Sequence, residues 1–193
     1  WGFDDVMFEP EQMKPNGDFP TASSPNPEEG EALDRAIQMA RRNEAELVLA
    51  TDPDADRLGI AVKHDGVFRL LTGNQLSALM VNFVIEQSKK HDLVEGTPGV
   101  VTTVVTSPLV QKAAHAQDAK CPLVLTGFKW IAEVMRRWEK NGEADFLMGT
   151  EESYGYLVGK HCRDTDGIVA ACIVGEMAAV AKSRGKTLVD ELY

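Results

Sequence analysis

The second part of the chain alternates between segments with helical periodicity and short β-branched segments, and this order constrains the fold most strongly. From residue 72 onward it predicts helix, strand, helix, strand, helix, strand and helix. Because parallel strands need crossover connections, this alternation favours a parallel sheet with helices on its faces. Asn74 is the expected N-cap of the first helix, and Ser107 followed by Pro108 opens the second. The remaining expected elements are strands at 100–105, 122–125 and 145–148 and helices over 130–140 and 166–183.

The first 70 residues follow a different pattern. Residues 1–27 are rich in Pro, Asn, Asp and Ser and predict an irregular arm. An amphipathic helix over 28–43 and strands at 46–50 and 58–62 follow, and an Asp-Gly turn leads into a further strand at 67–71 as a hairpin. The fold class expected is α/β with mixed or parallel sheets and helices on both faces. A partial domain, 1–70, would precede one three-layer domain, 71–193.

An acidic loop connects the strands expected at 46–50 and 58–62. Asp52, Asp54 and Asp56 alternate with other residues there, and like charges this close repel unless a hard cation or a set of donors gathers them. An EF-hand is excluded, because Arg57 stands where its glycine belongs and Lys63 where its bidentate glutamate belongs. A solvated turn fits poorly between two buried strands. A nucleophilic Asp52 or Asp54, as in an aspartyl-phosphate phosphatase, stays open as an alternative.

Two strand-to-helix loops carry further polar groups, and ligands gather at such loops in α/β sheets. In the first, Thr126 and Gly127 precede Lys129, which lies near a helix N-terminus where an anionic ligand such as phosphate would offset its charge. Taken alone, a surface lysine over its aromatic neighbours explains this loop better. In the second, Glu151, Glu152 and Ser153 offer acceptors for a polyhydroxylated ligand, although a polar turn is the plain alternative.

Composition narrows the class of partner. The net charge of −10 argues against a nucleic-acid or membrane-surface role, but leaves room for an anionic substrate in a local basic pocket. The cysteines are few and widely spaced, which is typical of reduced thiols in a cytoplasmic protein. Neither they nor the histidines show metal-ligand spacing. Ser23 and Ser24 have no activating base nearby in sequence. No stretch is apolar enough to span a bilayer, and no signal peptide is visible.

Together and in this order, the loops resemble those of the α-D-phosphohexomutase family, which includes phosphoglucomutases, phosphomannomutases and phosphopentomutases. The run 52–57 matches the family's Mg²⁺-binding loop, and 151–153 matches its sugar-binding loop. The runs 126–131, 19–21 and 25–29 resemble the phosphoglucomutase and phosphopentomutase branch. The resemblance covers nearly the whole chain.

The resemblance implies a fragment of an intramolecular phosphotransferase, an isomerase. Such an enzyme moves a phosphoryl group between C1 and C6, or C1 and C5, of a sugar phosphate through a phosphoserine and a sugar bisphosphate. The expected substrates are glucose 1-phosphate and glucose 6-phosphate, or a pentose phosphate. The family's first and fourth domains, which carry the phosphoserine and a phosphate-binding loop, would be missing. Residues 1–70 would end the second domain and 71–193 would form the third. We expect the chain alone to be inactive.

The resemblance also implies roles for single residues. Asp52, Asp54 and Asp56 would hold Mg²⁺, and Arg57 would steady the phosphoryl group or the carboxylates. Lys129 would contact the substrate and take part in catalysis, and the remaining substrate-binding residues would be Thr126, Gly127, Glu151 and Ser153. A stand-alone sugar-phosphate-binding domain is the alternative to a mutase fragment.

Overall fold

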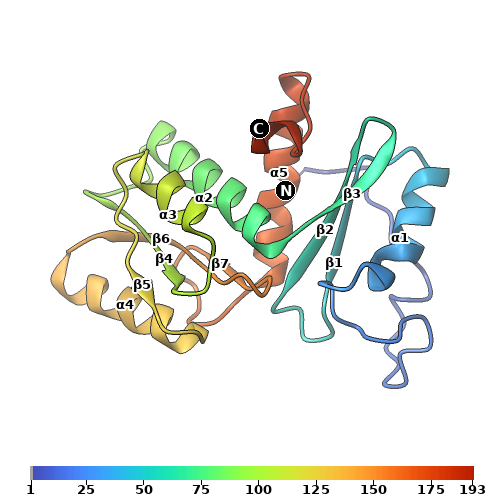
Figure 1. The fold of residues 1–193 in the computed structure, drawn as a ribbon, viewed down its shortest axis with the longest axis horizontal. Coiled ribbons are helices and arrows are strands. Elements are labelled where there is room, and N and C mark those ends of the chain that lie inside the picture. Colours follow the sequence, from blue (N-terminus) through green and yellow to red (C-terminus); the bar gives the residue numbers. More distant parts are fainter. Residues whose placement is uncertain (1) are drawn as a thin grey trace.

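The chain folds into two units that lie on either side of one long helix, α5 (Gly167–Ser183), as Figure 1 shows. The computed structural model describes residues 2–193, so Trp1 of the expected arm lies outside the described residues. We call residues 2–71 the N-terminal unit and residues 72–193 the C-terminal unit. Each unit contains one sheet with helices packed on it. The predicted α/β class with mixed sheets is confirmed.

The N-terminal unit consists of a coil, one helix and an antiparallel sheet. After the coil come α1 (Gly30–Arg42), β1 (Leu47–Thr51), β2 (Leu58–His64) and β3 (Val67–Leu71), with the strands in the order β1-β2-β3. Asp65 and Gly66 both have positive φ, the backbone that a tight hairpin turn requires, so the predicted hairpin is confirmed. The apolar stripe of α1 packs on Val48 and Ala61 of this sheet.

The C-terminal unit contains a mainly parallel sheet in the order β5-β4-β6-β7. Strands β4, β5 and β6 are parallel, as the alternation predicted, whereas β7 runs antiparallel to β6. Strand β7 was not predicted from the sequence, since it is short and only the loop 151–155 separates it from β6. In chain order the elements are α2 (Gly73–Lys90), β4 (Pro98–Thr103), α3 (Pro108–His115), β5 (Leu123–Val124), α4 (Phe128–Asn141), β6 (Asp145–Thr150), β7 (Tyr156–Val158), α5 and the 3₁₀ turn η1 (Asp190–Leu192).

Capping residues set the helix starts. The N-cap of α2 is Thr72, which forms a capping box with Gln75, so the prediction of Asn74 is wrong. Asn74 lies inside the first turn and accepts a hydrogen bond from the backbone N–H of Ser107 at 2.7 Å. Ser107 caps α3 ahead of Pro108, as predicted. The expected elements otherwise begin or end within a few residues of the observed ones.

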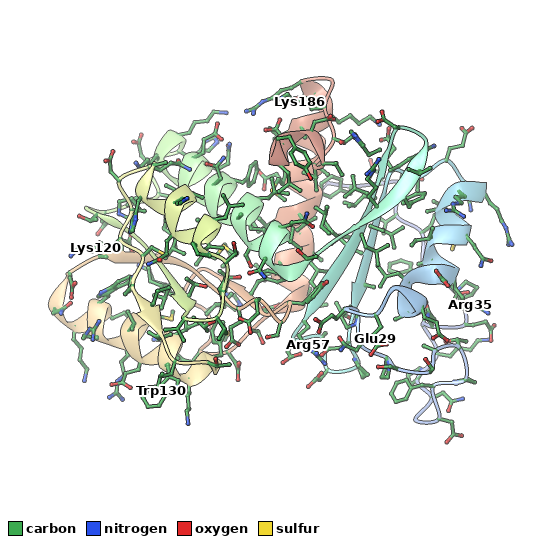
Figure 2. All side chains as sticks on the ribbon, viewed as in Figure 1. Glu29, Arg35, Arg57, Lys120, Trp130 and Lys186 are labelled. Atoms are coloured by element: carbon green, nitrogen blue, oxygen red, sulfur yellow. The ribbon has the colours of Figure 1, made fainter. Side chains whose placement is uncertain are left out.

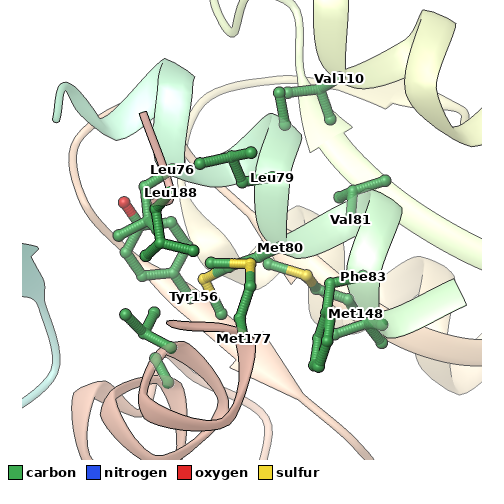
Figure 3. Packing of buried hydrophobic residues seen from close by; sticks show 14 of the residues in the cluster. Leu76, Leu79, Met80, Val81, Phe83, Val110, Met148, Tyr156, Met177 and Leu188 are labelled. Atoms are coloured by element: carbon green, nitrogen blue, oxygen red, sulfur yellow. The ribbon is translucent and has the colours of Figure 1, made fainter. Parts of the chain in front are cut away.

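Helices cover both faces of the second sheet. Helix α4 packs Ile131, Met135 and Trp138 on one face, in a cluster of its own. On the other face, α2, α3 and α5 enclose Tyr156 and Met148, and Figure 3 shows this packing around Met80 and Met177. None of the helices in residues 2–193 combines the length and apolar character that crossing a membrane requires.

The larger core extends from one unit into the other. Leu58, Ile60 and Val62 of β2 belong to the same buried cluster as α2 and α5. Helix α5 is therefore covered by the first sheet on one side and by β7 and α2 on the other. This explains why its sequence is apolar nearly all round rather than along one stripe. The shared core fixes the loops of the two units relative to each other.

Candidate active site

The acidic loop is organised by Asp52, the first residue after β1. Its side chain is buried, and Oδ1 accepts hydrogen bonds from the backbone N–H groups of Asp56 and Arg57, each at 3.1 Å. Oδ2 accepts a hydrogen bond from Arg57 Nε at 2.8 Å. Burial raises the pKa of Asp52, but the bond from Arg57 and the other donors outweigh it, so the pKa falls below 3.8. Asp52 is therefore a charged side chain that holds the loop in shape.

The loop gathers three carboxylates into one cluster. Asp52, Asp54 and Asp56 each offer an oxygen, and these oxygens lie within 4.8 Å of one another. Burial raises the pKa of Asp56 to about 6, and the carboxylates of Asp52 and Asp54 add to the rise. One guanidinium, that of Arg57, faces these three acids. An all-oxygen set with excess negative charge fits a hard divalent cation such as Mg²⁺.

The acidic loop contacts the C-terminal unit through the backbone. Arg57 forms an isolated antiparallel bridge with Gly155, which closes the 151–155 loop. The N–H of Gly167, at the start of α5, donates to the carbonyl of Ala55 at 2.9 Å. Figure 2 shows Arg57 at the junction of the two units. The expected metal loop and the expected sugar loop are thus direct neighbours.

Glu151 joins the loop before α4 to the loop 151–155, which leads from β6 into β7 and not into a helix as predicted. It follows β6, its side chain is almost fully buried, and its Oε1 accepts a hydrogen bond from the backbone N–H of Gly127 at 2.9 Å. Gly127 has φ +112°, which glycine adopts without strain. Burial raises the pKa of Glu151, and the nearby charge of Glu152 raises it further, while the bond from Gly127 opposes the rise. Of the predicted sugar-binding residues, the structure thus brings Glu151 and Gly127 into contact.

Glu152 and Ser153 have different surroundings. Oε2 of Glu152 accepts hydrogen bonds from the hydroxyls of Thr103 and Thr106, both at 3.1 Å, which ties the loop to the end of β4. Ser153 is exposed at the tip of the same loop. Its hydroxyl is therefore open to a ligand, whereas Glu152 is engaged within the protein.

Lys129 lies over the ring of its neighbour Trp130. Its Nζ lies 5.1 Å from the centroid of the Trp130 ring, and both side chains are exposed. Figure 2 shows Trp130 projecting outward from the end of the C-terminal unit. Thr126 is exposed beside it. The position of Lys129 agrees with its interpretation as a surface lysine, and a role in binding substrate or in catalysis stays a prediction.

Two residues that contact the acidic loop escaped the sequence analysis. Asn26 Oδ1 accepts a hydrogen bond from Arg57 Nη1 at 3.3 Å. The hydroxyl of Thr165, just before α5, donates to Asp56 Oδ2 at 3.3 Å. In the sequence, Asn26 was indicated only by its place in the Pro25–Glu29 run, and no pattern indicated Thr165.

Comparisons with known proteins identify the class of protein. The model of the phosphoglucomutase/phosphomannomutase α/β/α domain III matches residues 72–193, and that of α/β/α domain II matches residues 1–66. The chain belongs to the phosphoglucomutase/phosphomannomutase family, and the resemblance to the phosphohexomutases is confirmed.

Individual relatives agree with this family. The chain is 37% identical to the glucose 1,6-bisphosphate synthase of Mus musculus, over all of this chain and 31% of that protein. It is 37% identical to a phosphoglucomutase of Staphylococcus aureus strain N315, over 94% of this chain and 32% of that protein. A putative phosphomannomutase from Thermus thermophilus shares the fold, with a TM-score of 0.65 and 24% identity over 88% of this chain and 34% of that chain. The chain spans about a third of the length of these curated relatives.

The raised pKa of Asp56 leads to a first prediction, for the substitution of Asp56 by asparagine. The pKa of Asp56 is about 6 in the folded chain, against an ordinary value of 3.8. The charged carboxylate therefore lowers the free energy of unfolding above pH 6, and this loss of stability fades as the pH falls from 6 towards 3.8. Without cations, Asp56→Asn should therefore stabilise the chain at neutral pH by about 0.5 kcal/mol, a small value because solvent screens the half-exposed group. Thermal unfolding should show a rise of about 1–2 °C in Tm. The gain should shrink on acidification, and added Mg²⁺ should reverse it; a gain independent of pH would contradict this origin.

Proposed function

We propose that this chain supplies the cation-binding and sugar-binding part of a phosphosugar mutase, which moves a phosphoryl group between two positions of a sugar phosphate. The observation that carries the proposal is the direct contact of the two loops, through the bridge between Arg57 and Gly155. Membership of the phosphoglucomutase/phosphomannomutase family supports it. In this proposal residues 1–70 end a second domain and 71–193 form a third.

Asp52, Asp54 and Asp56 are the residues proposed to hold Mg²⁺. The donor set fits, because it is made only of carboxylate oxygens, and burial together with the neighbouring carboxylates raises the pKa of Asp56 to about 6, a cost that a bound cation would relieve. A bound Mg²⁺ would neutralise charge on a phosphoryl group during its transfer. Arg57 keeps Asp52 charged and the loop closed, and its remaining N–H groups can face a phosphoryl oxygen.

Glu151 and Ser153 are the residues proposed to hold sugar hydroxyls. The carboxylate of Glu151 is fixed by the Gly127 N–H, which leaves its other oxygen for a ligand. A buried carboxylate makes strong hydrogen bonds to hydroxyl groups because little water competes with them. Thr126, Gly127 and Lys129 would line the same loop on the substrate side, with Lys129 turning from Trp130 towards a phosphate.

The names of the relatives suggest the substrate. One relative is a glucose 1,6-bisphosphate synthase and another is a phosphoglucomutase. We therefore propose a glucose phosphate, with pentose phosphates as the alternative. The phosphoserine that the resemblance implies would belong to a domain outside this sequence, so we expect the 193-residue chain to bind glucose 1-phosphate without converting it to glucose 6-phosphate.

An aspartyl-phosphate phosphatase fits the geometry less well. Both oxygens of Asp52 accept hydrogen bonds, from two backbone N–H groups and from Arg57, and these donors lower the pKa of the carboxylate and with it its nucleophilicity. Asp54 is exposed, and beryllofluoride labelling of Asp54 would support this alternative.

Glucose 1-phosphate binding in the presence of Mg²⁺ tests the proposal. Glu151→Gln should weaken binding about tenfold, since it removes a charged hydrogen-bond acceptor. Glu143→Gln is the matched control, because Glu143 is a glutamate in the turn before β6 and pairs with Lys120. Calorimetry or ligand-detected NMR should find the control unchanged. Equal affinities for the wild type and Glu151→Gln, or equal losses in both variants, would contradict the proposal.

A further inference from the structure

The segment between β7 and α5 gathers a second set of metal-ligand side chains. His161, Cys162 and Asp166 each offer one ligand atom, and these atoms lie within 4.8 Å of one another. The sequence analysis expected no such set, because the spacing of these residues matches no common pattern. The loop 159–166 curls back before α5, and this brings positions 161 and 162 against the N-cap residue of the helix.

The three ligand atoms are held close together by the hydrogen bonds of the loop. Asp166 Oδ1 caps α5 by accepting from the N–H groups of Ile168 and Val169, each at 2.9 Å. Its other oxygen, Oδ2, lies 2.8 Å from His161 Nε2. The thiol of Cys162 is held nearby by a hydrogen bond to the carbonyl of Asp164 at 3.2 Å. The helix therefore occupies one carboxylate oxygen, and the other pairs with His161, so an ion would enter between Oδ2 and Nε2 in place of the proton that joins them.

The flanking cations are engaged elsewhere. Arg163 forms a two-point pair with Glu139 of α4, with both distances 2.8 Å. Lys160 pairs with Asp145 of β6. Neither side chain therefore supplies the positive charge that would replace a metal ion beside Asp166.

We propose that His161, Cys162 and Asp166 form a binding site for a transition-metal ion of the Zn²⁺ type. A thiolate, an imidazole and a carboxylate are the ligands that Zn²⁺ and Co²⁺ prefer, whereas Mg²⁺ prefers oxygen alone. Binding releases the thiol proton to solvent, and the proton between His161 Nε2 and Asp166 Oδ2 is also released, or is held at Nδ1 instead, so that the Nε2 lone pair faces the ion. Three protein ligands at an accessible loop leave a fourth position for water.

This site shares no ligand with the acidic cluster of Asp52, Asp54 and Asp56, but Thr165 connects the two. Thr165 lies between Cys162 and Asp166 in sequence and donates to Asp56 Oδ2. The loop that would hold the transition metal is thus the one that contacts the Asp52–Asp56 loop. A bound ion would fix this loop and so restrain the position of Asp56.

Titration of the 193-residue chain with Co²⁺, in saturating Mg²⁺, tests the proposal. A thiolate-to-cobalt absorption band should appear and should be removed by added Zn²⁺. Cys162→Ser should abolish the band, and His161→Gln should weaken Co²⁺ binding by about 10–100-fold. Cys172→Ser is the matched control, since Cys172 is a similarly half-exposed cysteine in α5, and it should keep the band.

The readout does not depend on enzyme activity, and circular dichroism checks that each variant is folded. No band in the wild type would overturn the proposal. A band that survives in folded Cys162→Ser, or one that Cys172→Ser removes, would assign the cobalt to another thiol and overturn it equally.

Discussion

Asp52→Ala is expected to abolish divalent-cation binding and to lower the free energy of unfolding by about 2–3 kcal/mol. The side chain is buried and accepts hydrogen bonds from two backbone N–H groups and from Arg57 Nε. Alanine would leave these donors without their acceptor and Arg57 without its partner charge. Denaturant unfolding and a Mg²⁺ titration by calorimetry measure the two effects separately.

Asp54→Ala is the matched control for this substitution. Asp54 belongs to the same carboxylate cluster but is exposed. Its loss should weaken cation binding while changing the free energy of unfolding by no more than about 0.5 kcal/mol. Equal stability of Asp52→Ala and the wild type would show that Asp52 does not organise the loop.

Gly167→Ala is expected to separate the acidic loop from α5. A Cβ at this position would lie 2.7 Å from the carbonyl oxygen of Arg57 and 2.8 Å from that of Ala55. Both are backbone atoms, so the two units must shift apart. We expect a loss of about 1–3 kcal/mol in the free energy of unfolding, together with weaker Mg²⁺ binding.

Gly175→Ala, in the middle of the same helix, provides the comparison. A Cβ there meets only the ring of Phe3, at 3.3 Å, and alanine favours the helix by up to about 1 kcal/mol over glycine. This variant should therefore be close to the wild type in stability and in Mg²⁺ affinity. If the two glycine variants behave alike, the contact between α5 and the acidic loop does not position the cation site.

Local sequence patterns predicted most elements of the fold. Periodicity located the main helices, β-branched runs located the parallel strands, and Asp-Gly placed the hairpin. The strand β7 was missed because a three-residue strand carries little pattern of its own. The prediction of Asn74 as the cap of α2 is wrong because asparagine and threonine both cap helices, and only the fold turns Asn74 towards Ser107.

The types of residue in the site could be predicted from the sequence, but the contacts between them could not. The acidic run itself predicted the cluster that the structure shows. The bond between Glu151 and Gly127 and the bridge between Arg57 and Gly155 join residues far apart in sequence. Such contacts depend on the packing of whole units. The same reason hid Asn26, which contacts Arg57 across the unit. The set of His161, Cys162 and Asp166 is local, and it escaped prediction because its spacing matches no common metal-site pattern.

The central claim is that the two loops form one site, and backbone amide NMR of the chain tests it most directly. Glucose 1-phosphate added with Mg²⁺ should shift the signals of residues 52–57 together with those of Gly127 and residues 151–155. The claim would be contradicted if the shifted signals belonged to other parts of the chain, or if Mg²⁺ and the sugar phosphate each perturbed a different region with no residues in common.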